Sequence, residues 1–417
     1  MERLSWQEQD RVTVAHKSGY SKFIVRAQSL YGVAGVAPLT DGWFAVADGR
    51  VLACGSGPLP AELPDGGAAA DLPVLDYSDR IIAPGYIDIH CHGAGGYAFD
   101  QISEADGFAA VAAAKRVHQQ HGTTRQILSL VTADVASLEA RCMAAAELCE
   151  TDPHFLGIHL EGPFLAVQKC GAHDPNLLIA PNPEHVERLL KAAGGWLRQV
   201  TLAPELAHSE QAIAVLQEAG VRVAVGHTDC DFATAAGAFA AGASILTHAF
   251  NGMNGLQHRA PGPVAAAFDA HEVVLEVIAD GHHVHPRMIQ LLHEQAAGRV
   301  ALITDAMSAA GMPDGPAQIG ELAVAVVDGL PRLVREDGTL GSIAGSTLTM
   351  ERAVQVAVAS GWPLAEAIAA ATAIPARAIG AAATHGSLQS GYVADFVVLN
   401  DSLEVLETWV SGTQLTS

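Results

Sequence analysis

The strongest constraint on the fold is a regular alternation in the sequence after about residue 80. Eight short apolar runs, rich in Val, Ile and Leu, are separated by longer Ala-rich stretches of helical character. The runs are "IIAPGYIDIH", "RQILSLVT", "FLGIHLEG", "QVTLAPE", "VRVAVGHT", "SILTHAFN", "VVLEVIADG" and "VALITDAM". Runs without polar alternation are typical of strands buried on both faces, and helices between them favour parallel crossovers. The pattern predicts an α/β protein with a closed (β/α)8 TIM-like barrel, and an open doubly wound sheet is the alternative.

The two ends of the chain follow a different pattern. Residues 22–79 contain short β-like runs broken by Gly and Pro, and residues 385–417 include the β-like runs "ADFVVLN" and "LEVLETWVSGTQL". We expect these two segments to form one small β-sandwich domain, and the barrel to occupy residues 80–384. Residues 1–21 mix charges throughout and lack the apolar centre of a signal peptide, so a poorly ordered extension is expected there.

One segment interrupts the alternation inside the barrel. Residues 309–344 contain "ELAVAVVDGLPRLVREDGTL", a pattern that indicates a hairpin-type excursion. Two helices are expected to follow, from about Ser346 to Ile379. Pro375 would lie in the first turn of the second helix, where its missing N–H costs nothing.

Composition and charge narrow the classes of partner. The formal net charge of −22 leaves no general basic face for nucleic acid or for an anionic membrane. The longest weakly polar stretch, "FATAAGAFAAGASILTHAF", carries a histidine and divides at Gly242 into a helix and a strand, so no membrane span is expected. The six cysteines include no C-x-x-C pair, which argues against a disulfide framework and favours a cytoplasmic location. Small molecules are the expected partners.

Polar residues gather at the carboxyl ends of five of the apolar runs. They are His90, His92, Glu161, His227, His248 and Asp305. A lone histidine at a strand end usually faces solvent, but the carboxyl ends of barrel strands converge on one face, so six such residues indicate a shared site. Side chains at i and i+2 of a strand point the same way, so His90 and His92 can reach one metal while Cys91 points away. These nitrogen and oxygen donors suit zinc or a similar divalent ion.

With these motifs the sequence resembles the metal-dependent amidohydrolase superfamily and, within it, the family of N-acetylglucosamine-6-phosphate deacetylases. The resemblance runs in order from "APGYIDIHCHGAGG" through "GIHLEGPFL", "GAHDP", "VGHTDC", "THAFNGM", "HRAPG", "ADGHHVHP" and "LITDAMSAAG" to "AGSTLTM". It implies a hydrolase that cleaves the acetamide of an amino-sugar phosphate. In this family some phosphate ligands come from the neighbouring subunit, so the resemblance also implies a homodimer.

The resemblance further implies how the metal ligands are shared. Relatives with both histidines of the His-x-His motif bind two metals, whereas relatives without the first histidine bind one, so one or two ions per chain are expected. One metal would be held by His90, His92, Asp305 and Glu161, and the second by Glu161, His227 and His248. Many other amidohydrolases bridge their metals with a carboxylated lysine on strand four, but the fourth run, "QVTLAPE", has none. Its absence argues against dihydroorotase-like and urease-like functions.

Two residues receive catalytic roles from the resemblance. Asp305 is expected to act as general base on the attacking water and then to protonate the departing amine. His173, in the loop after the third run, is expected to contact the substrate and to stabilise the tetrahedral oxyanion. The alternative for His173 is an ordinary surface-loop histidine.

The phosphate requires a local anion pocket in so acidic a chain. Arg259 offers a planar fork that matches phosphate oxygens, and His283 can add a second donor. By resemblance, Asn251 and the backbone of Gly252 complete the phosphate and sugar contacts. The chain departs from the family pattern at Gly252, where Ala is usual, and at Asp174, where Asn is common.

Those departures leave the identity of the sugar open. One alternative is deacetylation of another N-acetylhexosamine 6-phosphate, such as N-acetylgalactosamine 6-phosphate, and another is hydrolysis of an N-acyl amino acid. A third alternative is a non-catalytic barrel that acts as a scaffold. That alternative predicts loss of metal-ligand residues, and none is lost.

Overall fold

The chain forms two compact units in the computed structural model, which describes residues 20–33 and 35–416. One unit runs to Gly85 and resumes at Ser387, and the other is Tyr86–Gly386. The extension expected over residues 1–21 lies outside the described residues except for its last two.

A single seven-stranded sheet makes up the smaller unit, and both chain ends contribute to it. Its strand order is β21-β20-β19-β4-β1-β2-β3, with β1 and β4 parallel and the other neighbours antiparallel. The strands are β1 (Lys22–Leu30), β2 (Leu39–Ala47), β3 (Arg50–Ser56), β4 (Val74–Pro84), β19 (Phe396–Leu399), β20 (Val405–Val410) and β21 (Thr413–Gln414), and the short 3-10 helix η1 covers Ala69–Asp71.

This sheet folds over on itself around an aromatic core. Phe44 of β2 lies edge-on to Phe396 of β19, with 5.2 Å between ring centroids, and Phe396 stacks on Trp409 of β20 at 5.0 Å. Aromatic pairs of this kind contribute about 0.5–1.5 kcal/mol beyond their buried area. The N-terminal and C-terminal strands therefore form the two layers of the predicted small β-sandwich.

Eight parallel strands form the barrel of the larger unit. They are β5 (Tyr86–Asp88), β8 (Thr123–Val131), β9 (Phe155–Glu161), β10 (Leu197–Leu202), β11 (Arg222–Val225), β12 (Ile245–Leu246), β13 (Val274–Ile278) and β14 (Val300–Ile303), each paired with the next in chain order. The first and last strands meet just beyond their ends, where the Asp305 N–H donates to the His90 carbonyl and the His92 N–H donates to the Ala306 carbonyl, both at 2.8 Å. These bonds close the ring, so the (β/α)8 prediction is confirmed and the open sheet is excluded.

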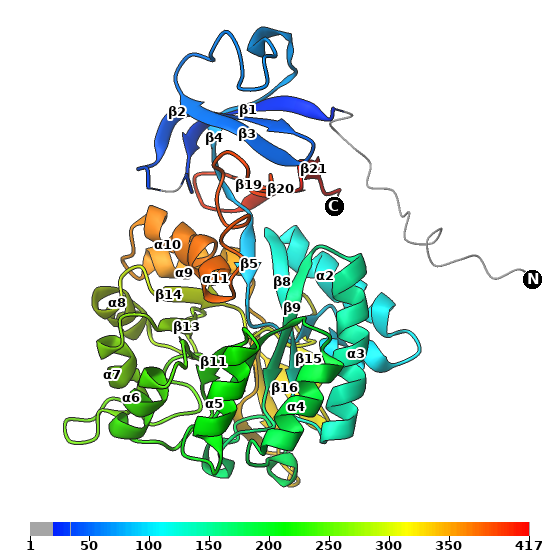
Figure 1. Cartoon of the computed structure of the whole chain (residues 1–417), viewed down its shortest axis with the longest axis vertical. Coiled ribbons are helices and arrows are strands. Elements are labelled where there is room, and N and C mark those ends of the chain that lie inside the picture. The colour runs from blue at the N-terminus through cyan, green and yellow to red at the C-terminus, as the bar shows by residue number, and fades with distance from the viewer. Residues whose placement is uncertain (1–19, 34, 417) are drawn as a thin grey trace, which may run out of the picture. The chain divides into compact units, whose positions relative to one another are not determined.

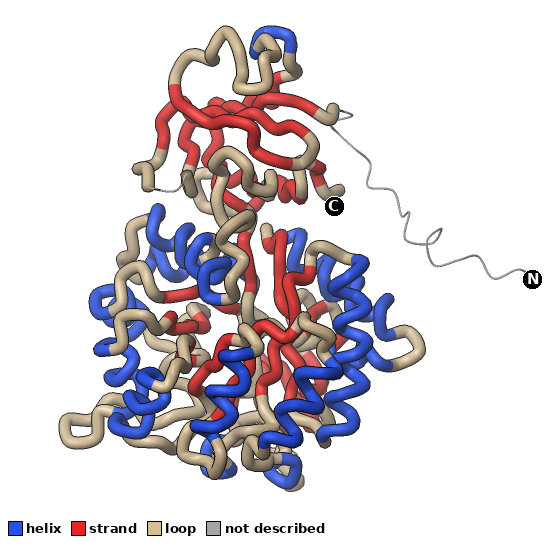
Figure 2. Tube along the Cα trace, in the orientation of Figure 1, coloured by secondary structure: helices blue, strands red, loops and turns tan. Residues whose placement is uncertain are grey.

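Helices cover the outside of the barrel strands, as Figures 1 and 2 show. The helices between strands are α2 (Gly107–Gln120), α3 (Val135–Thr151), α4 (Pro183–Ala192), α5 (Ser209–Glu218), α6 (Phe232–Ala240), α7 (Gly262–Asp269) and α8 (Pro286–Gln295). Several begin at a residue whose side chain accepts from the first turn, as Asp134 does from Ala136 and Ser137. In the described part of the chain, no helix has both the length and the apolar character that crossing a membrane requires.

The segment after β14 is larger than the predicted hairpin. It forms a four-stranded antiparallel sheet of β15 (Gly315–Ile319), β16 (Leu322–Val327), β17 (Leu330–Val334) and β18 (Leu340–Ile343). Val324 and Val326 of β16 pack with Met307 and Val131 of the barrel. The extra strands thus cover an apolar face that a lone hairpin would leave exposed.

Three helices follow this sheet, where the sequence predicted two. They are α9 (Met350–Ala359), α10 (Leu364–Ala370) and α11 (Ala373–Ala378). The second predicted helix is broken at Thr372, which has φ −137° and ψ −81° and whose hydroxyl donates to the Ile368 carbonyl. Pro375 is the third residue of α11, in its first turn as expected.

Candidate metal centre

The six candidate metal ligands lie together at the carboxyl end of the barrel. They follow or end the strands β5, β9, β11, β12 and β14: His90, His92, Glu161, His227, His248 and Asp305. His227, His248 and Asp305 adopt φ values of +45°, +27° and +49°, in the left-handed region that residues other than glycine seldom occupy. Backbone strain of this kind persists where the surrounding structure enforces it, and it clusters at functional sites.

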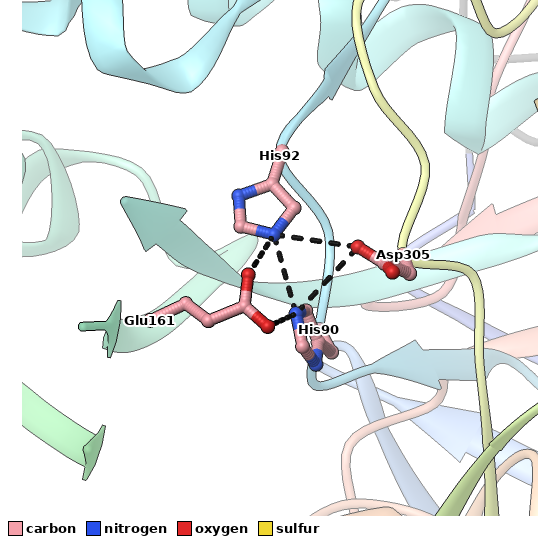
Figure 3. A group of neighbouring side chains, drawn as sticks. All are labelled: His90, His92, Glu161 and Asp305. Carbon is pink, nitrogen blue, oxygen red and sulfur yellow. Dashed lines mark hydrogen bonds and ion pairs between the residues drawn. The ribbon is translucent and has the colours of Figure 1, made fainter. Parts of the chain in front are cut away.

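One half of the centre is built from the His-x-His motif and two carboxylates (Figure 3). His92 Nε2 lies 3.0 Å from Glu161 Oε2 and 3.4 Å from Asp305 Oδ1. His90 Nε2 lies 3.3 Å from Glu161 Oε1 and 3.6 Å from Asp305 Oδ1. The two imidazoles and the two carboxylates thus point at one small volume, and their candidate ligand atoms all lie within 4.8 Å of one another.

The other half of the centre shares Glu161. Its Oε1 lies 3.2 Å from His227 Nε2 and 3.0 Å from His248 Nε2, and these two nitrogens are 3.0 Å apart. Glu161 therefore contacts both histidine pairs: its Oε1 lies near His90, His227 and His248, and its Oε2 lies near His92. This is the position that a bridging carboxylate requires.

Hydrogen bonds behind the imidazoles orient three of them. His92 Nδ1 lies 3.2 Å from the Ser129 carbonyl, and His227 Nδ1 lies 2.8 Å from the Lys169 carbonyl at the end of the short helix η3 (Val167–Lys169). Because a carbonyl only accepts, each Nδ1 carries a proton, and Nε2 is the ring nitrogen that faces the centre and could bind a metal. His90 is held in the same way by a carboxylate, Glu276.

The electrostatics of the centre favour positive charge opposite its carboxylates. Burial opposes ionisation, yet the charge of His90 and hydrogen bonds from neighbouring histidines hold the pKa of Glu161 well below its usual range, and the pKa of Asp305 is also lowered. Burial would lower the pKa of His92, but its hydrogen bonds with Asp305 and Glu161 raise it to about 9. Two ionised carboxylates facing four imidazole nitrogens are a donor set that a divalent cation fits, and these residues could hold a metal.

A cavity of about 290 Å³ opens beside the candidate ligands. Its lining includes four of the candidate ligands and four of the five predicted substrate residues, together with an additional apolar and small-residue part. The ligands are Glu161, His227, His248 and Asp305, the substrate residues are His173, Asn251, Gly252 and His283, and the additional part is Ile278, Ile319, Ser342, Ile343 and Gly345. This volume is close to the lower end of the range for small-molecule sites.

His173 is buried at the boundary between the cavity and the centre. Its Nε2 lies 3.5 Å from Glu161 Oε2, and burial, the largest effect on it, lowers its pKa to about 4. A neutral imidazole carries one N–H, which can donate either to Glu161 or to a ligand in the cavity. The structure also groups His173 with Glu161 and His227 as a possible ligand set, which the sequence analysis did not anticipate.

Part of the cavity wall is formed by Asn251, Gly252 and His283, which are residues predicted to bind the sugar phosphate. Asp280 accepts a 2.6 Å hydrogen bond from His283 Nδ1, so His283 Nε2 is the ring nitrogen left to meet a ligand. Gly252 has φ +58°, and a Cβ there would lie 3.0 Å from His227 Nδ1, so the glycine at this departure from the family pattern avoids a close approach to a candidate ligand.

Arg259 and Asp174 lie away from this wall. Arg259 is exposed and does not line the cavity of its own chain. Asp174 is half-buried and caps the short helix η4 (Pro175–Leu177), where its side chain accepts from Asn176 N–H. Of the predicted phosphate and sugar residues, the structure thus brings together all except Arg259.

Sequence reasoning missed a buried layer beneath the centre. Glu276 of β13 lies 3.1 Å from His90 Nδ1, and His159 of β9 packs edge-on to His90 with 4.6 Å between ring centroids. A signal was present for both, since Glu276 places a charge inside an apolar run and His159 precedes Glu161 by two residues, on the same face of the strand. The wall residues Ser342 and Ile343 carry no such signal, because their place depends on how the four-stranded sheet folds back.

Comparison with known proteins places this site in a family. Residues 81–415 match the model of the amidohydrolase family. The chain is 36% identical over 348 residues to the N-acetylglucosamine-6-phosphate deacetylase of Bos taurus, which covers 81% of this chain and 84% of that protein. It is 37% identical over 343 residues to the N-acetylgalactosamine-6-phosphate deacetylase of Escherichia coli O157:H7, with 81% and 89% covered.

A solved structure is similar to this chain over almost its whole length. The N-acetyl-D-glucosamine-6-phosphate deacetylase of Mycobacterium smegmatis, solved in complex with N-acetyl-D-glucosamine-6-phosphate, superposes with a TM-score of 0.86 at 36% identity and covers 95% of this chain and 100% of that one. Matches of this extent include both the barrel and the strands from the chain ends. The chain belongs to the amidohydrolase family.

Proposed function

We propose that this chain hydrolyses the acetamide of N-acetyl-D-glucosamine 6-phosphate, releasing D-glucosamine 6-phosphate and acetate, as a zinc-dependent cytoplasmic homodimer. The observation that carries the proposal is the convergence of six ligand-type side chains beside a cavity that is also lined by His173, Asn251, Gly252 and His283. The similarity to N-acetylglucosamine-6-phosphate deacetylases supports the same substrate.

Zinc would be held by His90, His92, Asp305 and Glu161 on one side of the centre, and by Glu161, His227 and His248 on the other. When bound, such an ion lowers the pKa of a coordinated water and polarises a carbonyl group. The Nε2 atoms that the backbone carbonyls of Ser129 and Lys169 orient toward Glu161 support this assignment.

Proton transfer belongs to Asp305. Its carboxylate, which has a lowered pKa and lines the cavity, takes a proton from the attacking water as the new C–O bond forms. The same proton is then delivered to the amine nitrogen as the C–N bond breaks, so that acetate and the free amine leave. His173 donates a hydrogen bond to the carbonyl oxygen as negative charge develops on it.

The sugar phosphate would be bound by His283 and Asn251, which line the cavity together with Gly252. Arg259 projects outside the cavity of its own chain. Its position supports a homodimer in which a second copy supplies this arginine to the phosphate.

A second candidate substrate is N-acetyl-D-galactosamine 6-phosphate. It is favoured by the 37% identity to the N-acetylgalactosamine-6-phosphate deacetylase of Escherichia coli O157:H7. The two substrates differ in the configuration at a single hydroxyl, so both fit the acetamide and phosphate ends of the site equally.

The proposal is tested by measuring amine and acetate release from N-acetylglucosamine, N-acetylgalactosamine and N-acetylmannosamine, each with and without the 6-phosphate, after reconstitution with zinc. We expect the highest kcat/KM with N-acetylglucosamine 6-phosphate. A preference for the galactosamine isomer would transfer the assignment to that sugar. Equal activity with and without phosphate would refute the sugar-phosphate substrate.

A further inference from the structure

A buried carboxylate lies directly behind the metal centre and takes no part in the chemistry described above. Glu276 is on β13, and its side chain is fully shielded from solvent. Its Oε2 lies 3.1 Å from His90 Nδ1, and its Oε1 accepts a 2.8 Å hydrogen bond from Gln199 Nε2. Oε2 also lies 3.4 Å from the backbone N–H of His248. Glu276 therefore contacts a candidate ligand from each half of the centre.

The strand geometry explains why Glu276 faces inward. Side chains two residues apart on a strand point to the same side, and Ile278, two residues further along β13, lines the cavity. Glu276 thus lies one layer below the cavity in the barrel interior, where Gln199 of β10 reaches it from across the barrel.

The partner of His90 differs from those of the other candidate ligand histidines. The Nδ1 atoms of His92 and His227 face neutral backbone carbonyls. His248 Nδ1 has no hydrogen-bond partner within the described ranges. His90 alone of these four has a carboxylate behind it. A negative charge at Nδ1 increases electron density at Nε2, so it strengthens His90 as a ligand more than a carbonyl would.

The charge of the buried Glu276 side chain also links it to the metal centre. A carboxylate withdrawn from water is costly unless a positive charge compensates it, and no Lys or Arg side chain is paired with Glu276 in the described structure. His90, whose Nδ1 lies 3.1 Å from Glu276, is the group through which a cation bound at Nε2 can compensate this carboxylate.

We propose that Glu276 is a positioning residue that sets the zinc affinity of the half of the centre formed by His90, His92 and Asp305. The inference rests on the proposed function, since it concerns the same divalent centre. It accounts for a full charge in the middle of an otherwise apolar strand. It also makes the two halves unequal, because only one half contains the carboxylate-backed histidine.

The test is a zinc titration of Glu276→Gln, which preserves the size of the side chain and can still accept from His90 through its amide oxygen. Zinc affinities are measured on metal-free protein against a competing chelator, and metal content is measured by mass spectrometry. We expect the affinity of one bound zinc to fall by about ten- to a hundredfold while that of the other changes little. Asp100→Asn is the matched control, because Asp100 is also a buried barrel carboxylate but has Arg141 and the Val131 N–H as its partners.

Thermal unfolding of the metal-free variant separates positioning from folding. Since Gln keeps the side-chain volume and its amide oxygen can still accept from His90 Nδ1, the metal-free variant should still unfold in one cooperative transition, as the wild type does. Unchanged affinity for every zinc that the wild type binds would overturn the inference, as would equal weakening of all of them. Substrate assays on the wild type test the proposed function independently of the zinc titration. If the wild type cleaves no amino-sugar phosphate but Glu276→Gln still weakens one zinc site selectively, the proposed function is refuted and this inference stands.

Discussion

Asp305 and His90 contact each other twice across the seam of the barrel. The backbone N–H of Asp305 donates to the His90 carbonyl at 2.8 Å, and the Asp305 carboxylate lies 3.6 Å from His90 Nε2. The first contact joins the end of the last strand to the end of the first. The residues that close the barrel are therefore also candidate ligands in this half of the metal centre. The strands position these ligands, and no mobile loop is required.

Asp305→Asn should lower kcat by on the order of 10²–10⁴-fold, while KM changes much less, because a proton carrier acts mainly in the transition state. The substitution preserves the backbone bond that closes the barrel. Steady-state kinetics with N-acetylglucosamine 6-phosphate provide the measurement, with metal content determined on the same sample because Asp305 is also a candidate ligand. Retention of more than about a tenth of wild-type activity would remove Asp305 from the general-base role.

Glu161→Gln should weaken both zinc sites together. Glu161 offers Oε2 to His92 and Oε1 to His227 and His248, and a neutral amide cannot balance two dications. The expected result is a metal content well below one ion per chain after dialysis that leaves the wild type loaded. Glu139→Gln, a surface change at the ion pair with Arg188, is the control and should retain the wild-type content. Loss of a single ion would show that Glu161 does not bridge.

The barrel was predictable because each of its strands is marked by a short apolar run in the sequence. Each strand is an apolar run, and the ligand positions follow from the ends of those runs, so His92, Glu161 and Asp305 could be placed on one face before any contact was known. Assignment of His90 and His92 to one side of a strand needed only the two-residue period.

Features that depend on long-range packing were less predictable. The segment after β14 forms four strands, and its Val324 and Val326 pack in one buried cluster with Val131. Val131 lies almost two hundred residues earlier in the chain, so this contact could not be predicted from the local pattern. The exposed position of Arg259, outside the cavity, was not predicted either, since its motif indicates a phosphate ligand but not where the side chain lies.

His118 should make the protein sensitive to acid between about pH 6.5 and pH 4. It is fully buried, and burial lowers its pKa to about 4, below the value near 6.5 that it has in the unfolded chain. A depressed pKa means that its contribution to stability is present above pH 6.5 and is lost as the pH falls toward 4. At pH 5 the loss is on the order of 2 kcal/mol.

The measurement for this prediction is the free energy of unfolding by denaturant at pH 7 and pH 5, with the chelated, metal-free protein at both values. His118→Gln should lose less stability between the two than the wild type. His271→Gln removes an exposed histidine as the matched control and should behave as the wild type does. An identical pH dependence in His118→Gln and wild type would contradict the prediction.

Arg259→Met should raise KM for N-acetylglucosamine 6-phosphate and leave the weaker hydrolysis of unphosphorylated N-acetylglucosamine nearly unchanged. A charge-assisted contact to phosphate contributes on the order of 2 kcal/mol, roughly thirtyfold in binding, and only when the phosphate is present. The control is Arg287→Met, which removes another exposed arginine, one paired with Glu294, and should alter neither substrate. If Arg259 instead held its own loop in place, the variant would lose activity on both substrates equally and would melt at a lower temperature.

A mixing experiment tests whether Arg259 acts in the site of a second copy, since it lies outside the cavity of its own chain. Mixing Arg259→Met with the inactive Asp305→Asn should restore up to a quarter of wild-type activity through hybrid dimers. Absence of such complementation would place the arginine in its own subunit's site.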